Sequence, residues 1–243
     1  MEFEEPAFVL SARLHGEAGA IVEALTALSG KWAAHVAGGA SRRLKPHLQP
    51  GARVTFAYRA RMTEQLGSAR VEGTGSGPSD LFDDSAALAG LTSAAAVVAA
   101  ALPEREPHPG VFRAFEALTL ALADEDIWPA VMVRFEAGLL ADLGFGLDLS
   151  VCAVTGATDD LAWVSPRTGR AVSAAAGEPY KDRLLSLPMF LLSAQGRLVP
   201  GDIEAGLMLT GHFLQACVFN SLDRPLPAAR ERMIDRLRER GRL

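Results

Sequence analysis

The chain has very little cysteine and no run of strongly apolar residues long enough to cross a membrane. Cys152 and Cys217 are the only cysteines among 243 residues, which excludes a disulfide framework and fits a reducing compartment. The first residues, Met1 to Glu5, are acidic and carry the wrong charge for a secretory signal. The uncharged stretch 85–103 consists mainly of small residues, so we interpret it as a closely packed buried helix.

The sequence also lacks the usual patterns of catalytic and metal sites. It contains no H-E-x-x-H and no G-x-S-x-G. Cys152 is followed by Thr155 where a C-x-x-C pair needs a second thiolate, and the five histidines are scattered. The acidic residues 124–126 lie between expected helices and are interpreted as a cap or a solvated turn. We therefore expect neither enzymatic activity nor a metal or other cofactor.

Charge is distributed unevenly along the chain. The formal net charge is −5, but it divides into +2 for residues 1–75, −11 for residues 76–166 and +4 for residues 167–243. This pattern suggests separate tasks for separate parts. Between Glu23 and Glu64 there is no acidic residue, and the segment carries seven cations: Lys31, Arg42, Arg43, Lys45, Arg53, Arg59 and Arg61. Such an uncompensated positive field usually has a polyanionic target.

This cationic segment combines a glycine turn with an alternating strand. Gly38 and Gly39 precede the basic loop, and residues 53–59 alternate polar and apolar side chains. Basic groups beside aromatic rings form a track for single-stranded nucleic acid. We therefore predict a nucleic-acid site made of the seven cations and of the stacking residues Trp32 and Tyr58, with Phe56 as a further stacking candidate. A solvated basic face without a partner is the alternative.

The first 75 residues are expected to form a small closed barrel. Strands are predicted at Ala7–Arg13, Lys31–Val36, Arg53–Arg61 and Leu66–Glu72. Apolar residues at 21, 22, 25 and 28 have a helical spacing, so Ile21–Leu28 is predicted to be a short helix.

A glycine-rich stretch, residues 73–80, is the clearest domain boundary. No Gly-Lys-Ser/Thr follows it and Pro78 interrupts the expected helix start, which argues against a phosphate-binding loop. Ser79 or Asp80 is expected to cap the next helix. We therefore predict a nucleic-acid-binding domain at 1–78 and a second domain at 79–243.

The second domain is predicted to be mainly helical. Its expected helices are Ser85–Leu102, Val111–Ala123, Ile127–Leu143, Asp202–Phe219 and Pro227–Leu243, with a β-hairpin over residues 161–173. Phe112 and Phe115 share one helix face, for which core packing is the default interpretation. Arg113 and Arg134 are isolated cations in an acidic region, where they could clamp a carboxylate ligand or form internal salt bridges.

Several motifs, taken in order, resemble the bacterial RecO family of recombination mediators, most closely its alphaproteobacterial forms. The resemblance covers nearly the whole chain. The matching residues are Ala7-Phe8-Val9-Leu10, Gly38-Gly39-Ala40-Ser41-Arg42-Arg43, Leu48-Gln49-Pro50-Gly51, Arg134-Phe135-Glu136, Leu143-Gly144-Phe145, Cys152-Ala153-Val154-Thr155-Gly156 and Val164-Ser165-Pro166.

The resemblance implies an α+β protein: a five-stranded OB-fold β-barrel followed by an α-helical domain with a β-hairpin insert at about 150–177. It further implies a cytoplasmic, nucleoid-associated protein that binds single- and double-stranded DNA and anneals complementary strands. Such a protein helps RecR load RecA onto single strands coated by the single-stranded-DNA-binding protein. The implied partners are DNA, RecR, the acidic tail of that binding protein and, indirectly, RecA, with no membrane.

Two parts of the family pattern need separate treatment. Many members carry two C-x-x-C pairs where this chain has Cys152, Thr155, Ser173 and Ala176, so zinc is not carried over and the hairpin is expected to persist as a metal-free, degenerate knuckle. Arg134 matches a family motif in the domain that binds the acidic tail. From the helix face we add Arg113, Phe112 and Phe115 to the expected tail site.

Two other functions are open on the residues alone. A protein-interaction scaffold could use the basic loop to dock an acidic partner. An RNA-binding OB-fold protein could use the same aromatic residues, because stacking tolerates either sugar.

Overall fold

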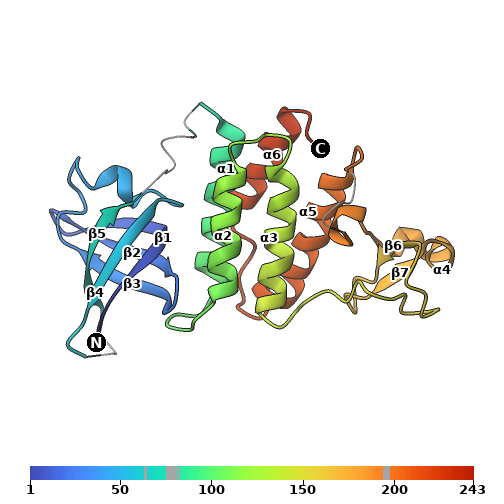
Figure 1. Cartoon of the computed structure of the whole chain (residues 1–243), viewed down its shortest axis with the longest axis horizontal. Helices are drawn as coiled ribbons and strands as arrows, with labels where there is room; N and C mark the ends of the chain where they lie inside the picture. Colours follow the sequence, from blue (N-terminus) through green and yellow to red (C-terminus); the bar gives the residue numbers. More distant parts are fainter. Residues whose placement is uncertain (63–64, 75–80, 82, 194–197) are drawn as a thin grey trace. The chain divides into compact units, whose positions relative to one another are not determined.

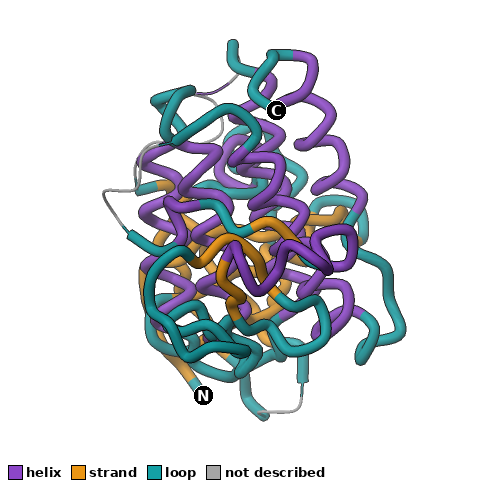
Figure 2. Tube along the Cα trace, turned by 90° about the vertical axis from the view of Figure 1, so that its right-hand side faces the viewer, coloured by secondary structure: helices purple, strands orange, loops and turns teal. Residues whose placement is uncertain are grey.

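The computed structural model of the protein describes residues 1–62, 65–74, 81, 83–193 and 198–243 (Figures 1 and 2). The fold is α+β, with an N-terminal closed barrel followed by helices and a small three-stranded sheet. By its internal contacts the chain divides into two units. The first comprises Met1–Glu125 with Pro227–Arg236, and the second comprises Asp126–Leu226 with Leu237–Leu243. The expected boundary near residue 78 lies outside the described residues.

Five strands close the barrel in the order β1-β2-β3-β5-β4. They are β1 (Glu2–His15), β2 (Gly19–Thr26), β3 (Gly30–Val36), β4 (Arg53–Arg59) and β5 (Gly67–Gly73). Neighbouring strands pair antiparallel except for β3 and β5, which pair in parallel at two positions, Ala34 with Gly67 and His35 with Ser68. The predicted five-stranded OB-type barrel is confirmed.

The helix predicted at Ile21–Leu28 is wrong, because this segment is strand β2. Alternate residues Ala20, Val22 and Ala24 enter the barrel core, as a strand requires. Leu25 points to the other face but is also fully buried. A strand that is covered on both faces loses the polar half of its alternation, and its apolar spacing then imitates a helix.

The barrel interior contains a cluster of aromatic rings. The ring of Tyr58 lies 4.7 Å from Trp32 and 5.2 Å from Phe3, measured between centroids, and Phe3 lies 5.3 Å from Trp32. Phe56 belongs to the same core. The alternation that predicted strand β4 therefore directs its aromatic residues inward rather than toward solvent.

Part of the outer barrel surface is covered by two helices, α1 (Ser85–Ala101) and α2 (Pro109–Ala121). Phe8 of β1 is buried outside the barrel core, with its ring 5.2 Å from Phe112 and 4.9 Å from Phe115. Helix α1 is capped by the Asp84 carboxylate, which accepts hydrogen bonds from the next helical amides. The caps expected at residues 79 and 80 lie outside the described residues.

The connection between α1 and α2 also packs on the barrel. Lys31 Nζ donates a 2.6 Å hydrogen bond to the carbonyl of Ala99, and so places a cation at the C-terminal end of α1. The amide of Arg105 donates to the carbonyl of Lys31 at 2.8 Å. Gly30 has a φ of +84°, and a Cβ at this position would lie 1.9 Å from the carbonyl oxygen of Glu106. Only glycine allows this close approach.

The second unit contains helices, a sheet and the predicted hairpin. Its main elements are α3 (Trp128–Asp142), β6 (Leu161–Val164), β7 (Ala171–Ser173), α4 (Ala174–Gly177), β8 (Leu185–Ser186), α5 (Asp202–Phe213) and the π-helical turn Leu214–Phe219. The sheet order is β7-β6-β8. Helices α3 and α5 are joined by a buried hydrogen bond from Thr210 Oγ1 to Glu136. The last helix, α6 (Ala228–Glu239), spans the boundary between the units.

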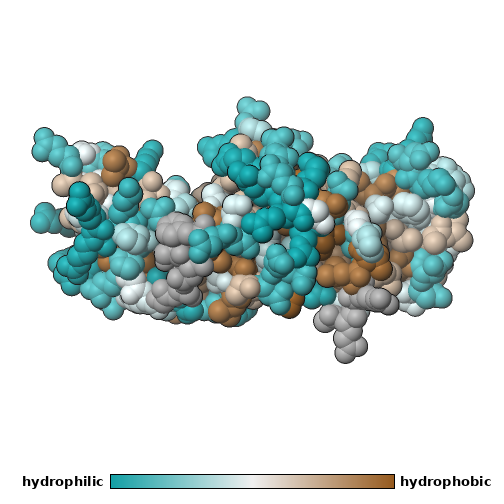
Figure 3. Space-filling model, turned by 90° about the horizontal axis from the view of Figure 1, so that it is seen from above, coloured by the Kyte–Doolittle hydropathy of each residue, from teal (hydrophilic) through white to brown (hydrophobic). Residues whose placement is uncertain are grey.

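Most of the face visible in Figure 3 is hydrophilic, with separate apolar patches between the polar atoms. Among the described residues, every helix is too short or too polar to span a bilayer. The uncharged segment that forms α1 is packed instead through small side chains such as Ala87, Ala94 and Ala95, all of which are buried.

Phe8 tests whether the barrel and the helices α1 and α2 form one stable unit. We expect Phe8→Ala to lower the free energy of unfolding by about 3–5 kcal/mol, because it removes a buried ring and leaves a cavity against α2. The measurement is urea unfolding of the whole chain. Leu14→Ala, on the same strand at a position that is 76% exposed, is the matched control and should change stability little. Equal, small effects of both substitutions would contradict this packing.

Candidate nucleic-acid interface

The loop between β3 and β4 holds the densest group of exposed cations on the barrel. The chain leaves β3 through Gly38, whose φ of +71° suits glycine, and Ala40 is tied back to the carbonyl of Ala18 by a 3.1 Å hydrogen bond. A short 3₁₀ turn, η1 (Lys45–Leu48), follows, and its Leu48 is buried in the barrel core. The backbone of this loop is therefore anchored at both ends.

The cations of this anchored loop point to solvent. Arg42, Arg43 and Lys45 are exposed, and none of them forms an ion pair with another described residue. Long cationic side chains in this state keep their full charge and their hydrogen-bond donors for an external anion. We refer to Arg42, Arg43 and Lys45 as the loop cations.

The other four predicted cations differ in their surroundings. Lys31 is buried and its ammonium group is bound to the carbonyl of Ala99, so it does not face a ligand. Arg53 forms a 2.7 Å ion pair with Glu116. Arg59 lies 3.9 Å from Glu2, and this exposed pair is weak. Arg61 is exposed, without an ion pair among the described residues.

The predicted stacking residues require a correction. Trp32 is 3% exposed, Tyr58 is 1% exposed and Phe56 is fully buried, all within the barrel core. In addition, the guanidinium group of Arg105 lies 5.1 Å from the centre of the Trp32 ring. These rings stabilise the barrel and do not offer faces to nucleobases.

One further cation on the barrel was missed by the sequence prediction. Arg70 on β5 is exposed and has no ion pair among the described residues. With Arg43 it lines a surface hollow of about 630 Å³. Strand alternation around Ala69 and Val71 could have placed Arg70 outward, but it lies beyond the acid-free segment on which the prediction was based.

The residues predicted to bind an acidic partner tail are divided between the two units. Phe112 and Phe115 are buried against Phe8, so they belong to the core and line no open apolar site. Arg113 is exposed on α2 in the first unit, whereas Arg134 belongs to α3 in the second.

Arg134 has a defined role within its own unit. Its guanidinium group donates hydrogen bonds to the carbonyl oxygens of Phe190, at 2.7 Å, and Ser193, at 3.0 Å. It also lies 5.9 Å from the centre of the Phe190 ring. Arg134 therefore holds the 3₁₀ turn Met189–Leu191 and the following Ser193 against α3 while remaining exposed.

The hairpin of the second unit keeps a knuckle-like turn around a single thiol. The sulfur of Cys152 accepts hydrogen bonds from the amides of Ser173, at 3.2 Å, and Thr155, at 3.4 Å, and lies 3.5 Å from Ser173 Oγ. Burial raises the pKa of Cys152, but these hydrogen bonds outweigh it and lower the pKa to about 6. Among the described residues no group of three or more His, Cys, Asp or Glu side chains could hold a metal ion.

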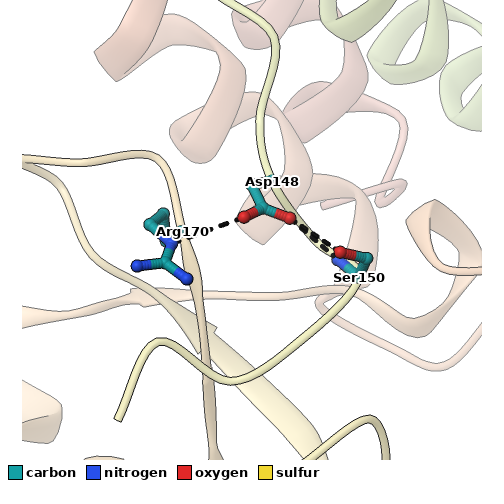
Figure 4. A network of polar contacts seen from close by, with 3 residues as sticks. All are labelled: Asp148, Ser150 and Arg170. Carbon is teal, nitrogen blue, oxygen red and sulfur yellow. Dashed lines mark hydrogen bonds and ion pairs between the residues drawn. The ribbon is translucent and has the colours of Figure 1, made fainter. Parts of the chain in front are cut away.

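A polar network fixes the entry to this hairpin. Asp148 accepts hydrogen bonds from Ser150 Oγ, at 2.8 Å, and from the Ser150 amide, while Arg170 Nε lies 3.4 Å from its other oxygen (Figure 4). The hydrogen bonds from Ser150 hold the pKa of Asp148 below its usual value, burial opposes them, and Arg170 lowers it further. Polar contacts therefore join the segment that precedes Cys152 to the residue that precedes β7.

Comparison with known proteins covers both parts of the chain. Residues 1–74 match the family model "Recombination protein O N terminal", and residues 83–224 match "Recombination protein O C terminal". The chain is 71% identical to "DNA repair protein RecO" of Phenylobacterium zucineum and 66% identical to that of Caulobacter vibrioides, over the full length of each pair. The RecO of Rhodospirillum centenum is 51% identical over 98% of this chain and 96% of its own.

The hydrogen-bonded thiol of Cys152 predicts a pH dependence. Because its pKa in the folded chain lies below the ordinary value of 9.0, its contribution to stability is complete above about pH 9 and is lost as the pH falls to about 6. The melting temperature of the protein should therefore fall relative to that of Cys152→Ala over this range. If the melting temperatures of the two proteins change with pH by the same amount over this range, the lowered pKa of Cys152 is contradicted.

Arg134 predicts a local effect. Arg134→Ala should increase amide hydrogen exchange over residues 189–193 and lower the free energy of unfolding by about 1–2 kcal/mol, because two charge-assisted hydrogen bonds are lost. Arg113→Ala, at an exposed position of α2 that forms no ion pair with a described residue, should leave that exchange unchanged. Unchanged exchange over residues 189–193 in Arg134→Ala would contradict the bracing role.

Proposed function

The chain belongs to the recombination protein O family of DNA repair proteins, and from this premise we propose that it acts as a non-enzymatic mediator of homologous recombination. In this proposal the barrel binds single- and double-stranded DNA and promotes annealing of complementary strands. The protein then helps RecR load RecA onto single strands coated by the single-stranded-DNA-binding protein. It works in the cytoplasm, at the nucleoid.

The observation that carries the proposal is the group of loop cations. Three adjacent exposed charges on an anchored backbone can neutralise successive phosphates, and each neutralised phosphate releases counterions. Arg61 and Arg70, which form no ion pair with a described residue, extend the exposed positive charge onto other parts of the barrel. Because the barrel aromatics are buried, the binding should depend mainly on the phosphate backbone and little on base identity.

The same electrostatics supports annealing. Two complementary strands repel each other through their phosphates, and a cationic surface that neutralises part of this charge lets their bases approach. Such a role requires no bond-making chemistry. It also allows both single and double strands as ligands, since both carry the phosphate charge that the cations neutralise.

We further propose that the helical unit binds the acidic tail of the single-stranded-DNA-binding protein. Arg134 remains a candidate contact, because it is exposed and its fork of five donors exceeds the two hydrogen bonds it makes to carbonyl groups. Arg113 is a second exposed cation, and RecR is a proposed partner without an assigned surface.

The salt dependence of DNA binding tests the role of the loop cations. If the loop cations and Arg61 contact phosphates, log K for a single-stranded oligonucleotide should fall with log salt with a slope of about −3. Arg42→Ala/Arg43→Ala/Lys45→Ala should flatten this slope to about −1 and weaken binding strongly at low salt. These exposed residues make few packing contacts, so the variant should keep its melting temperature. The measurement is fluorescence polarisation over a salt series.

The matched control is Arg53→Ala, whose charge is already paired with Glu116. It should leave the slope nearly unchanged. Heparin should compete with DNA if the contact is electrostatic. If the slope is unchanged in the triple variant, or changes equally in Arg53→Ala, the loop cations are not part of the DNA site.

A further inference from the structure

Strand β5 is paired along most of its length with one neighbouring strand only. On one side it pairs with β4 from Ser68 to Gly73, but on the other side it pairs with β3 only at Gly67 and Ser68. Strand β3 ends at Val36, where the chain turns away into the basic loop. Beyond Ser68, the side of β5 that faces away from β4 therefore has no neighbouring strand among those of the described chain.

The hydrogen bonds to β4 identify the backbone groups at this edge. The amide of Thr74 donates to the carbonyl of Arg53 at 3.1 Å, so these two residues form a hydrogen-bonded pair. Such pairs alternate in an antiparallel ladder, and Arg70 and Glu72 therefore bond to β4 as well. On the side away from β4, the parallel bridge between His35 and Ser68 engages the amide of Ala69 with β3. The C=O of Ala69 and both backbone groups of Val71 point to the same side, where no strand of the described chain pairs with them.

A hollow of about 630 Å³ adjoins these groups. Its lining includes buried apolar residues, Val36 and Val71, and two exposed arginines without ion pairs among the described residues, Arg43 and Arg70. Among the described residues of the lining, Glu72 is the only carboxylate. The edge is thus flanked by net positive charge and has an apolar floor.

We propose that this edge of β5 binds an extended acidic peptide by strand addition. The peptide backbone would pair with the C=O of Ala69 and with the N–H and C=O of Val71, while its carboxylates would meet the guanidinium groups of Arg43 and Arg70. Backbone donors and acceptors side by side on a strand edge match a peptide and not a phosphodiester chain. None of the described residues that line the hollow is aromatic, so they offer no stacking surface of the kind that favours nucleobases.

This inference does not rest on the proposed DNA binding, but the two sites share Arg43. Acidic peptide and DNA should therefore compete for the barrel. An acidic partner segment on β5 would release DNA from the loop cations by occupying one of them and by adding negative charge beside the others.

The test uses the full chain and an octapeptide of alternating Asp and Val. A second peptide of the same sequence, N-methylated at alternate amides, keeps the charge but cannot complete a β-ladder. We expect the first peptide to slow amide hydrogen exchange at Val71, as followed by NMR, and the methylated peptide to bind at least tenfold more weakly. Equal binding of both peptides, or no added protection at Val71, would overturn the proposal.

Charge-reversal variants provide a second test of peptide binding. Arg43→Glu and Arg70→Glu should each weaken peptide binding roughly tenfold to a hundredfold. Arg13→Glu, an equally exposed cation on β1, should weaken it much less. A single-stranded oligonucleotide is tested in parallel. If the oligonucleotide protects Val71 and the peptide does not, the edge belongs to the DNA site and the proposal fails, whereas peptide protection of Val71 beside DNA binding that leaves this amide unprotected supports it.

Discussion

The packing of helices α1 and α2 on the outside of the barrel is the constraint on which the rest of the first unit depends. Phe8 is buried between barrel and α2, and Lys31 supplies the cation that α1 lacks in its own last turn. These contacts use barrel surface that would otherwise be open to a ligand. They also engage two of the predicted cations, because Lys31 binds the carbonyl of Ala99 and Arg53 is paired with Glu116 of α2. The loop between β3 and β4 keeps three exposed cations that form no ion pair with a described residue.

The fold could be predicted from the sequence wherever one face of an element is polar. The helices and the hairpin show clear periodicity, and their predicted ranges agree with the structure to within a few residues. The failure at β2 has a physical cause, because Leu25 is covered by a second layer that local periodicity does not report. The strands of a barrel with covered outer surface cannot be separated from helices by apolar spacing alone.

The candidate site shows the same limit. The acid-free segment correctly indicated an exposed cationic loop, since Arg42, Arg43 and Lys45 follow a glycine turn and are all exposed. It could not reveal that Lys31 caps a helix far along the chain, or that Tyr58 points into the core. Both outcomes depend on long-range contacts. The hydrogen bonds around Cys152 were not predicted either. Its sulfur accepts them from the backbone amides of Thr155 and Ser173, and donors of this kind cannot be recognised from side-chain types.

The central claim is that the anchored loop of the barrel, and not its aromatic residues, meets DNA. Photo-crosslinking of the full chain to a single-stranded oligonucleotide with a photoreactive base, followed by peptide mapping, tests it most directly. The account predicts crosslinked peptides from residues 37–49 and from β5, with few from the segment around Phe8 that α2 covers. Crosslinks concentrated on α2 or on residues 7–10 would show that the helices leave the barrel surface when DNA binds, and would contradict the account.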